Sequence, residues 1–357
     1  DTHSDTHNDT LIYGNMLMSY DVKQRVGKAK KKIDPVYKEW DKIKRSLHDY
    51  EYIYTSSTPT KNVALVNPVS RSYFKMKEMI QTCEIPILNS RIVCLAEAPG
   101  GFIQSLLEES ISEIHGVTLV SEDPRVPYWN RSLRNDPRVI FQFGSQKNGD
   151  LYDYKNILSL ITAMKKNSMN LVTGDGGFDN SHDYNRQESN SLRLIYSEIY
   201  LALHLQAVGG IFICKVFDTF EPETIMLLYI LSCSYKSLSF YKPTVSRISN
   251  SEKYIICKGY HGYKVEHMNH LTHHFTDTKI NIGVPQSFVN MIHRFNETYA
   301  KIQINTIHKG LQKIKQRDYH RKPSVYQIDI AKQWCKKYKV SLNTSCRYLQ
   351  DNNGVFI

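Results

Sequence analysis

Apolar and polar positions follow one another in blocks that predict alternating strands and helices. A short apolar run, Ile92 to Leu95, ends at P-G-G over residues 99–101, and a helical pattern with Phe102 and Leu106 follows. A continuous apolar run of this length predicts a buried strand. The glycines let the backbone approach a nucleotide-like ligand at the end of that strand. A tight turn without a ligand would explain the same glycines.

Similar blocks recur along the chain. Further strands are expected at 115–120, 139–143, 170–173, 211–216, 239–241 and 253–258. Helices are expected at 36–47, at 70–80 with Ser70 or Ser72 as its cap, at 192–205 and from 286 onward. This alternation predicts an α/β fold, Rossmann-like, with a mainly parallel sheet and helices on both faces. The carboxyl ends of the strands then share one edge, where a ligand crevice belongs.

The chain divides by character into three parts. We expect a basic, partly disordered amino-terminal extension over 1–60, the α/β domain over 61–261, and a helical, basic carboxy-terminal region over 262–357. A lysine run, 28–32, lies in the first part and suits either a phosphate contact or a solvated loop. His3 and His7 lie in a polar repeat that reads as a disordered tail.

Composition narrows the class of protein. The 357 residues carry a formal net charge of +11, which favours a polyanionic partner, nucleic acid first and an anionic membrane surface second. A basic protein without such a partner stays open. The seven cysteines form no C-x-x-C pair, so reduced thiols are expected. No apolar stretch is long enough to span a bilayer and no signal-peptide pattern begins the chain, so we expect a soluble, intracellular protein.

Four polar residues are predicted at strand ends or helix faces around one crevice: Lys75, Asp175, Lys215 and Glu252. Lys215 interrupts the apolar run I-F-I-C-K-V-F, so it must be partly buried. A buried lysine is costly unless a carboxylate pairs with it, and Asp175 and Glu252 are the candidate partners. Any one such pair can be purely structural, whereas two lysines and two acids together indicate a site.

Several motifs resemble one family. These are S-R-S-Y-F-K-M-K-E-M, L-A-E-A-P-G-G-F, N-G-D-L-Y-D-Y-K-N-I, V-T-G-D-G-G-F, G-G-I-F-I-C-K-V-F-D-T-F and K-P-T-V-S-R-I-S-N-S-E-K-Y-I-I-C-K-G. Together, over Val69 to Gly259, they resemble the S-adenosylmethionine-dependent ribose 2′-O-methyltransferases of the FtsJ/RrmJ superfamily. The mRNA cap methyltransferases of eukaryotes and large DNA viruses look most similar. The run His182 to Glu188 looks like the viral members.

The resemblance implies a catalytic Lys-Asp-Lys-Glu tetrad at Lys75, Asp175, Lys215 and Glu252, with Lys77 as a second candidate for the first lysine. A ribose hydroxyl is a poor nucleophile, so it must be aligned and helped to lose its proton. We expect Lys75 and partial burial to lower the pKa of Lys215, which then accepts or steers that proton. The motifs require no metal ion.

The resemblance also implies S-adenosylmethionine as cofactor and capped RNA as partner. The implied cofactor residues are Glu97, Ala98, Pro99, Gly100, Gly101, Phe102, Asp150 and Asp175. The implied substrate residues are Arg71, Ser246, Arg247, Asn250 and Ser251. Two positions depart from the family pattern, because Cys94 stands where an acid is common and Ala96 replaces the usual first glycine.

The expected activity is methyl transfer to the 2′-oxygen of the first transcribed nucleotide of 7-methylguanosine-capped mRNA. Three alternatives stay open: the second nucleotide, ribosomal or transfer RNA, and a non-catalytic RNA-binding subunit with the same fold. All four tetrad residues are present, which argues against the last of these.

Overall fold

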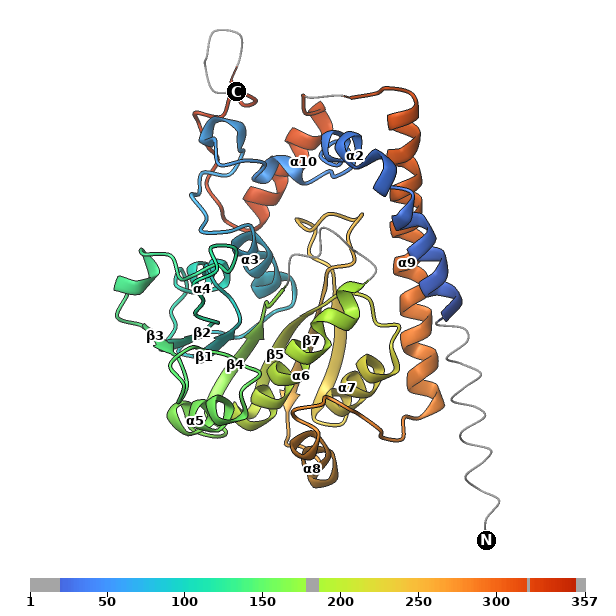
Figure 1. Cartoon of the computed structure of the whole chain (residues 1–357). Coiled ribbons are helices and arrows are strands. Elements are labelled where there is room, and N and C mark those ends of the chain that lie inside the picture. The colour runs from blue at the N-terminus through green and yellow to red at the C-terminus, as the bar shows by residue number, and fades with distance from the viewer. Residues whose placement is uncertain (1–19, 178–185, 320–321, 351–357) are drawn as a thin grey trace.

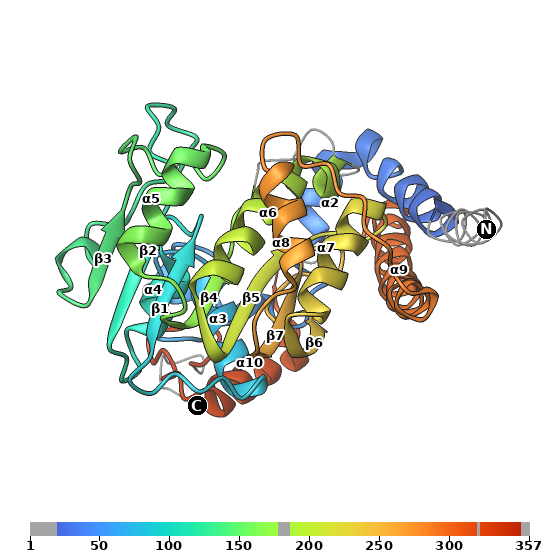
Figure 2. The same cartoon turned by 90° about the horizontal axis from the view of Figure 1, so that it is seen from below.

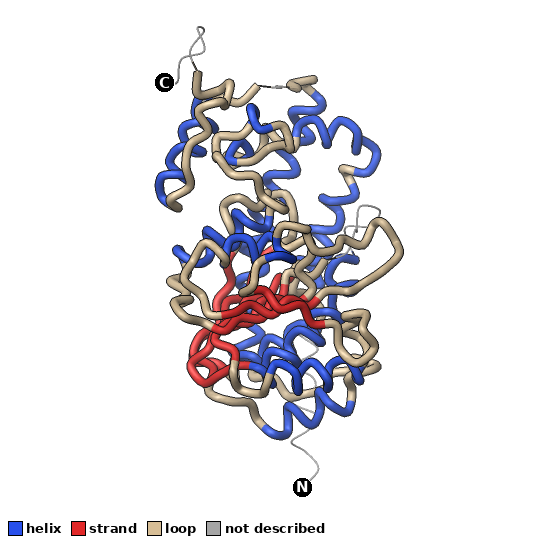
Figure 3. Tube along the Cα trace, turned by 90° about the vertical axis from the view of Figure 1, so that its left-hand side faces the viewer, coloured by secondary structure: helices blue, strands red, loops and turns tan. Residues whose placement is uncertain are grey.

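The computed structural model describes residues 20–177, 186–319 and 322–350. Figures 1 and 3 show one twisted sheet with helices on both faces, and a separate group of helices at one end. The predicted tail of histidines at residues 3 and 7, and most of the run 182–188, lie outside the described residues.

Seven strands form a single sheet in the order β3-β2-β1-β4-β5-β7-β6, which Figure 2 shows from side to side. The strands are β1 Arg91–Leu95, β2 Glu113–Val117, β3 Val139–Gln142, β4 Met169–Gly174, β5 Gln206–Val216, β6 Tyr235–Tyr241 and β7 Lys253–Tyr260. The pairs among β1 to β5 are parallel, whereas β7 is antiparallel to both β5 and β6. The mainly parallel sheet is confirmed. The prediction for β2 was wrong at its end, because residues 118–120 have left the sheet.

The α-helices are α2 Tyr37–Ile43, α3 Ser72–Thr82, α4 Gly101–Leu106, α5 Tyr154–Met164, α6 Gln187–Leu205, α7 Pro222–Ser232, α8 Val265–His273, α9 Gln286–Lys315 and α10 Val325–Lys337. Residues 20–31 are also helical. The 3-10 helices are η1 Asp34–Val36, η2 Glu51–Ile53, η3 Pro59–Lys61 and η4 Leu133–Asn135. Arg71, rather than a serine, occupies the N-cap of α3, although the Ser70 hydroxyl accepts the Ser72 amide at 3.3 Å.

Alternate residues of the central strands enter two different cores. In β1, Val93 and Leu95 join the core under α5 and α6, while Ile92 and Cys94 join the core under α3 and α4. A strand covered on both faces has no polar side to show, which explains its unbroken apolar run. The same arrangement fixes the register, because a slip of one residue would exchange the two faces.

The two ends of the chain pack together rather than separately. Trp40 and Ile43 of α2 share a core with Ile307 of α9, and Tyr52 and Ile53 share another with α10. Residues after 262 also reach the central core, since Leu271 of α8 packs there. The predicted boundaries at 60/61 and 261/262 stay predictions.

The seven cysteines are free thiols, as expected for a reduced protein. Within the described ranges, none of the helices combines the length and apolar character needed to cross a membrane.

Candidate functional site

The four tetrad positions meet at one edge of the sheet. Asp175 directly follows β4, and Lys215 is the penultimate residue of the neighbouring β5. Glu252 immediately precedes β7, which runs in the opposite sense and therefore begins at the edge where β5 ends. Lys75 comes from the second turn of α3. Sequence positions that are far apart are thus brought together at the expected crevice edge.

The site contains two ion pairs. The Lys75 ammonium donates to Glu252 Oε2 at 2.8 Å, and the Lys215 ammonium lies 3.2 Å from Asp175 Oδ1 and donates to the Asp175 carbonyl oxygen at 2.6 Å. The four side chains are between 10% and 15% exposed. They are screened from bulk water and still open to a ligand. Lys77 instead pairs with Glu108 and Glu109, so the structure brings Lys75 to the site.

The charges of these groups depend on one another. Burial alone would raise the pKa of Glu252, but Lys75 and Lys215 outweigh it and hold that pKa at about 2. Burial alone would lower the pKa of Lys215, but Asp175 and Glu252 outweigh it, and the pKa is raised. The expectation of a lowered pKa was therefore wrong. It gave more weight to burial and to the repulsion from Lys75 than to the attraction of the two partner carboxylates, which leave Lys215 a cation at neutral pH.

Two further residues belong to the site and were missed from the sequence. The Tyr254 hydroxyl donates to Asp175 Oδ1 at 2.7 Å and so fixes that carboxylate. It lies two positions after Glu252, with one residue between them, which is the spacing of a shared strand face and the signal that could have found it. Glu198 of α6 lies behind β5 and accepts the Cys214 thiol at 3.2 Å, and burial raises its pKa to about 8.

The turn after β1 is built from small residues. Ala96 has a φ of 51°, in the left-handed region where glycine is usual, so it occupies the conformation of the glycine it replaces. Gly100, with a φ of 108°, follows the Ala98–Pro99 peptide, which is cis. A Cβ on Gly100 would come within 2.2 Å of Leu133 Cδ1, so the absence of a side chain lets Leu133 pack against this turn.

Some predicted cofactor residues support this turn from within. The Glu97 side chain is buried, and its carboxylate accepts the Phe102 amide at 2.6 Å. Its burial raises its pKa well above the usual range. Phe102 itself is fully buried, and a Cβ on Gly101 would come within 2.1 Å of the Ser72 hydroxyl. These three residues shape the turn, and their contact with a cofactor stays a prediction.

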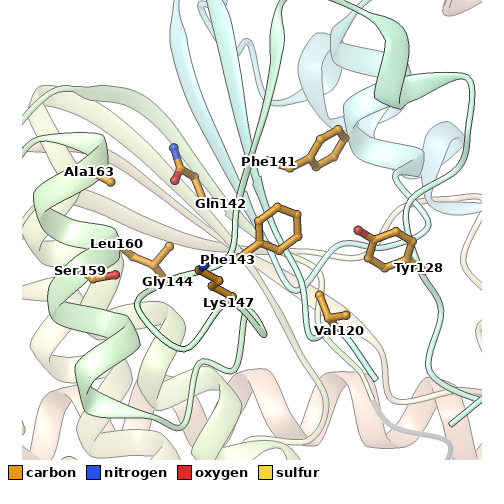
Figure 4. A pocket seen from close by; sticks show the side chains of 10 residues that line it. All are labelled: Val120, Tyr128, Phe141, Gln142, Phe143, Gly144, Lys147, Ser159, Leu160 and Ala163. Atoms are coloured by element: carbon orange, nitrogen blue, oxygen red, sulfur yellow. The ribbon is translucent and has the colours of Figure 1, made fainter. Parts of the chain in front are cut away.

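Asp150 lies in the turn after β3, where its Oδ1 accepts the Tyr152 amide at 2.8 Å. The Val120 amide donates to the Asn148 carbonyl at 2.7 Å, which places this turn beside the end of β2. A hollow of about 610 Å³ opens next to it along the edge strand β3, between Tyr128, Phe143 and Leu160 (Figure 4). The predicted cofactor residues, all of which are described, lie outside its lining.

The loop before β7 carries four of the five predicted substrate residues, and the fifth, Arg71, directly precedes α3. The Ser246 hydroxyl donates to Glu252 Oε1 at 2.8 Å, and the Lys242 ammonium donates to Asn250 Oδ1 at 2.7 Å and to the Glu252 carbonyl at 2.7 Å. Burial lowers the pKa of Lys242 to about 7. The Ser251 hydroxyl donates to Asp218 Oδ2 at 3.0 Å. The loop is thus tied directly to the tetrad.

The two predicted arginines, Arg71 and Arg247, meet at Glu51. Arg247 binds the buried Glu51 through two hydrogen bonds, of 3.0 Å and 2.7 Å. Arg71 lies 3.8 Å from the same carboxylate and donates to the Tyr54 carbonyl. Both arginines therefore hold the amino-terminal segment against the loop before β7. Their contact with a substrate stays a prediction.

Comparison with known proteins gives a consistent result. The model of the FtsJ-like methyltransferase family matches residues 68–260. The chain is 30% identical over 234 residues to cap-specific mRNA (nucleoside-2′-O-)-methyltransferase 1 of Trypanosoma brucei brucei, covering 61% of this chain and 63% of that protein. It is 31% identical to cap-specific mRNA (nucleoside-2′-O-)-methyltransferase 2 of Danio rerio, over 63% of this chain and 33% of that protein. It is 27% identical to cap-specific mRNA (nucleoside-2′-O-)-methyltransferase 1 of Mus musculus, over 65% of this chain and 30% of that protein.

The matches span less than two thirds of the length of each of these relatives. The family match, in contrast, covers more than half of this chain and includes all four tetrad positions. The chain therefore belongs to the FtsJ-like methyltransferase family.

Proposed function

We propose that the protein transfers a methyl group from S-adenosylmethionine to the ribose 2′-oxygen of RNA, at the first transcribed nucleotide of 7-methylguanosine-capped mRNA. One observation carries the proposal: the Lys75–Glu252 and Lys215–Asp175 pairs lie together at the carboxyl edge of the sheet. The similarity to cap-specific mRNA (nucleoside-2′-O-)-methyltransferases supports the choice of capped mRNA.

The residues at this edge fit the cofactor. Ala96 presents only a methyl group in the turn after β1, and Asp150 stands beside the end of β2, where an acid can accept hydrogen bonds from ribose hydroxyls. Gly177 is exposed, and a Cβ there would come within 3.0 Å of the Lys215 ammonium, so glycine keeps this approach clear. Bound S-adenosylmethionine supplies an electrophilic methyl group.

Lys215 acts as a cation in this proposal. An ammonium group has three hydrogens, of which one is given to the Asp175 carbonyl and another faces its carboxylate, leaving one for the substrate hydroxyl. Lys215 then orients the 2′-oxygen and stabilises the negative charge that develops on it. With S-adenosylmethionine bound, the oxygen–carbon bond would form as the carbon–sulfur bond breaks and leaves its electron pair on sulfur, and the hydroxyl proton would pass to water. The negative charges of Glu252 and Asp175 offset the repulsion between Lys75 and Lys215, so that both lysines can lie near the substrate 2′-oxygen.

Ser246, Asn250 and Ser251 shape the loop that faces the substrate, and we assign them to its positioning. Arg71 and Arg247 interact with Glu51 and so support the same loop from the side of the amino-terminal segment. Ser246 donates to Glu252 directly, Asn250 reaches it through Ser246, and Ser251 directly precedes it in the chain.

The test is methyl transfer from labelled S-adenosylmethionine to matched short RNAs. One RNA carries a 7-methylguanosine cap, one is uncapped, and one is capped and already 2′-O-methylated on its first nucleotide. Label on the first RNA alone is expected. Label on the pre-methylated RNA alone would move the target to the second nucleotide, which the resemblance to the Danio rerio methyltransferase 2 makes the second candidate. Label on none of them would overturn the proposal.

A further inference from the structure

A second hollow, of about 270 Å³, has Asp218, three residues beyond Lys215, in its lining. One wall is the helix through residues 20–31, and the other includes Asp218 and Phe220, which follow β5. Its lining includes five lysines or arginines but only two carboxylates. Three of the lysines belong to the run 28–32 that the sequence singled out and that the proposed reaction does not use.

The helix through residues 20–31 is firmly held in place. Val22 and Val26 pack against Ala300 of α9, with Phe220 alongside. The Lys23 ammonium donates to Glu221 at 2.5 Å on the other side. The hollow is therefore a fixed feature of the fold, bounded by apolar contacts that set its two walls.

The deep end of the hollow is connected to the tetrad. Lys30 is only 6% exposed, and its ammonium donates to Asp218 Oδ2 at 2.9 Å and to the Ser251 hydroxyl at 2.8 Å. Ser251 directly precedes Glu252, and Asp218 is three residues beyond Lys215. A group seated in the hollow would thus lie next to the residues that hold the reacting ribose.

At the mouth of the hollow, two lysines have no acidic partner among the residues that the structure describes. Lys28 and Lys31 are exposed, and within the described residues neither has a hydrogen-bond or ion-pair partner. The two carboxylates of the lining are already engaged. Asp218 is bound by Lys30, and Glu188 accepts the Glu221 amide at 2.8 Å.

We propose that this hollow binds a phosphate group of the RNA substrate through Lys28 and Lys31. The inference rests on the proposed function, since it names a contact of the same substrate. Lysine ammonium groups are ordinary partners of RNA phosphates. These lysines lie outside residues 68–260, so they are an addition of this chain to the family domain. The phosphate is either one of the cap's triphosphate bridge or a phosphodiester of the following nucleotides, and the two have the same chemistry.

The experiment compares Lys28→Ala/Lys31→Ala with Lys32→Ala/Lys38→Ala. Both variants lose two positive charges, and Lys32 and Lys38 are exposed and outside the lining. Alanine favours the helix, so the fold should persist. For each phosphate of a single strand that the protein contacts, the logarithm of the binding constant falls by about 0.7 for every tenfold increase in salt concentration. Loss of two contacts should therefore weaken binding about 25-fold at about 0.1 M salt and reduce the slope by about 1.4.

The probes are a short capped RNA and the cap dinucleotide, with binding followed by fluorescence anisotropy. Weakening of both probes relative to the control variant assigns the hollow to the triphosphate bridge. Weakening of the longer RNA alone assigns it to a phosphodiester. Equal affinities for the two variants on both probes would overturn the inference. Binding is measured without turnover. A wild-type protein that binds RNA but does not methylate it would therefore refute the proposed function, while the comparison of the two variants would still test the phosphate contact.

Discussion

Replacing Glu252 by glutamine removes one charge from the tetrad and keeps the size of the side chain. The pKa of this buried carboxylate is about 2, against an ordinary value of 4.5. The difference, 4.5 minus 2, corresponds to about 3 kcal/mol of folding free energy at neutral pH, since one pKa unit is worth about 1.4 kcal/mol. The attraction of Lys75, of Lys215 and, to a smaller extent, of Lys242 is its source.

The pH dependence follows with a definite sign. Because the folded pKa lies below the unfolded one, this stabilisation is present above about pH 4.5 and is lost as the pH falls toward about 2. About 2 kcal/mol of it should be gone by about pH 3. Wild type should thus be more stable than Glu252→Gln by about 3 kcal/mol at neutral pH, and the gap should narrow in acid.

The assay is urea unfolding followed by circular dichroism across this pH range, with Glu266→Gln as a control. Glu266 is an exposed carboxylate on α8, so its replacement should change the unfolding free energy by under about 0.5 kcal/mol. A stability gap between wild type and Glu252→Gln that stays constant with pH would refute the reasoning. It would mean that the lysines do not hold the Glu252 carboxylate ionised.

Three further substitutions test separate parts of the account. Lys215→Ala should lower the methyl-transfer rate by about 100-fold or more in single-turnover assays while RNA affinity stays within a few fold, and an unchanged rate would remove Lys215 from the reaction. Gly101→Ala should cost about 1–3 kcal/mol in urea unfolding, because its Cβ would lie 2.8 Å from the Tyr73 amide nitrogen, and wild-type stability would contradict that packing. Ala96→Val should destabilise by about 1–2 kcal/mol at a φ of 51°, whereas Ala96→Gly should be nearly neutral, and equal effects would deny the left-handed conformation.

The sequence indicated the location of the site because a charged residue, Lys215, interrupts an otherwise apolar strand there. A lysine within an apolar strand is costly, so Lys215 had to have an acidic partner nearby. Which acid pairs with which lysine depends on strand order and on the reversal of β7, and neither is encoded locally. The pairs Lys215–Asp175 and Lys75–Glu252 emerged only with the fold.

Residues that act at long range were the ones that sequence patterns missed. Glu78 is fully buried and accepts from the Tyr241 hydroxyl, the Thr244 amide and the Trp334 indole, at 2.6, 2.6 and 3.0 Å. It thereby joins α3, the loop before β7 and α10. In the sequence it is one of several charged residues on a helix, and partners more than 160 residues away leave no local signal.

The helical extensions show the same limit. Helices at 36–47 and from 286 onward were predicted from periodicity, but the helix of residues 20–31 and the packing of α2 on α9 were not. A Cβ on Gly310 of α9 would come within 2.4 Å of the Trp40 ring, so a single glycine determines how closely these helices approach. This contact helps to seat the helix of residues 20–31 beside the tetrad, where its lysines gain their proposed role.

The most direct test of the central claim compares two capped RNAs that differ by one atom. One has an ordinary ribose at the first transcribed nucleotide, and the other has a 2′-deoxyribose there. With labelled S-adenosylmethionine, the account predicts label on the ribose-containing RNA and none on its 2′-deoxy counterpart. Equal labelling of both RNAs would show that the methyl group goes to some other atom and would contradict the account.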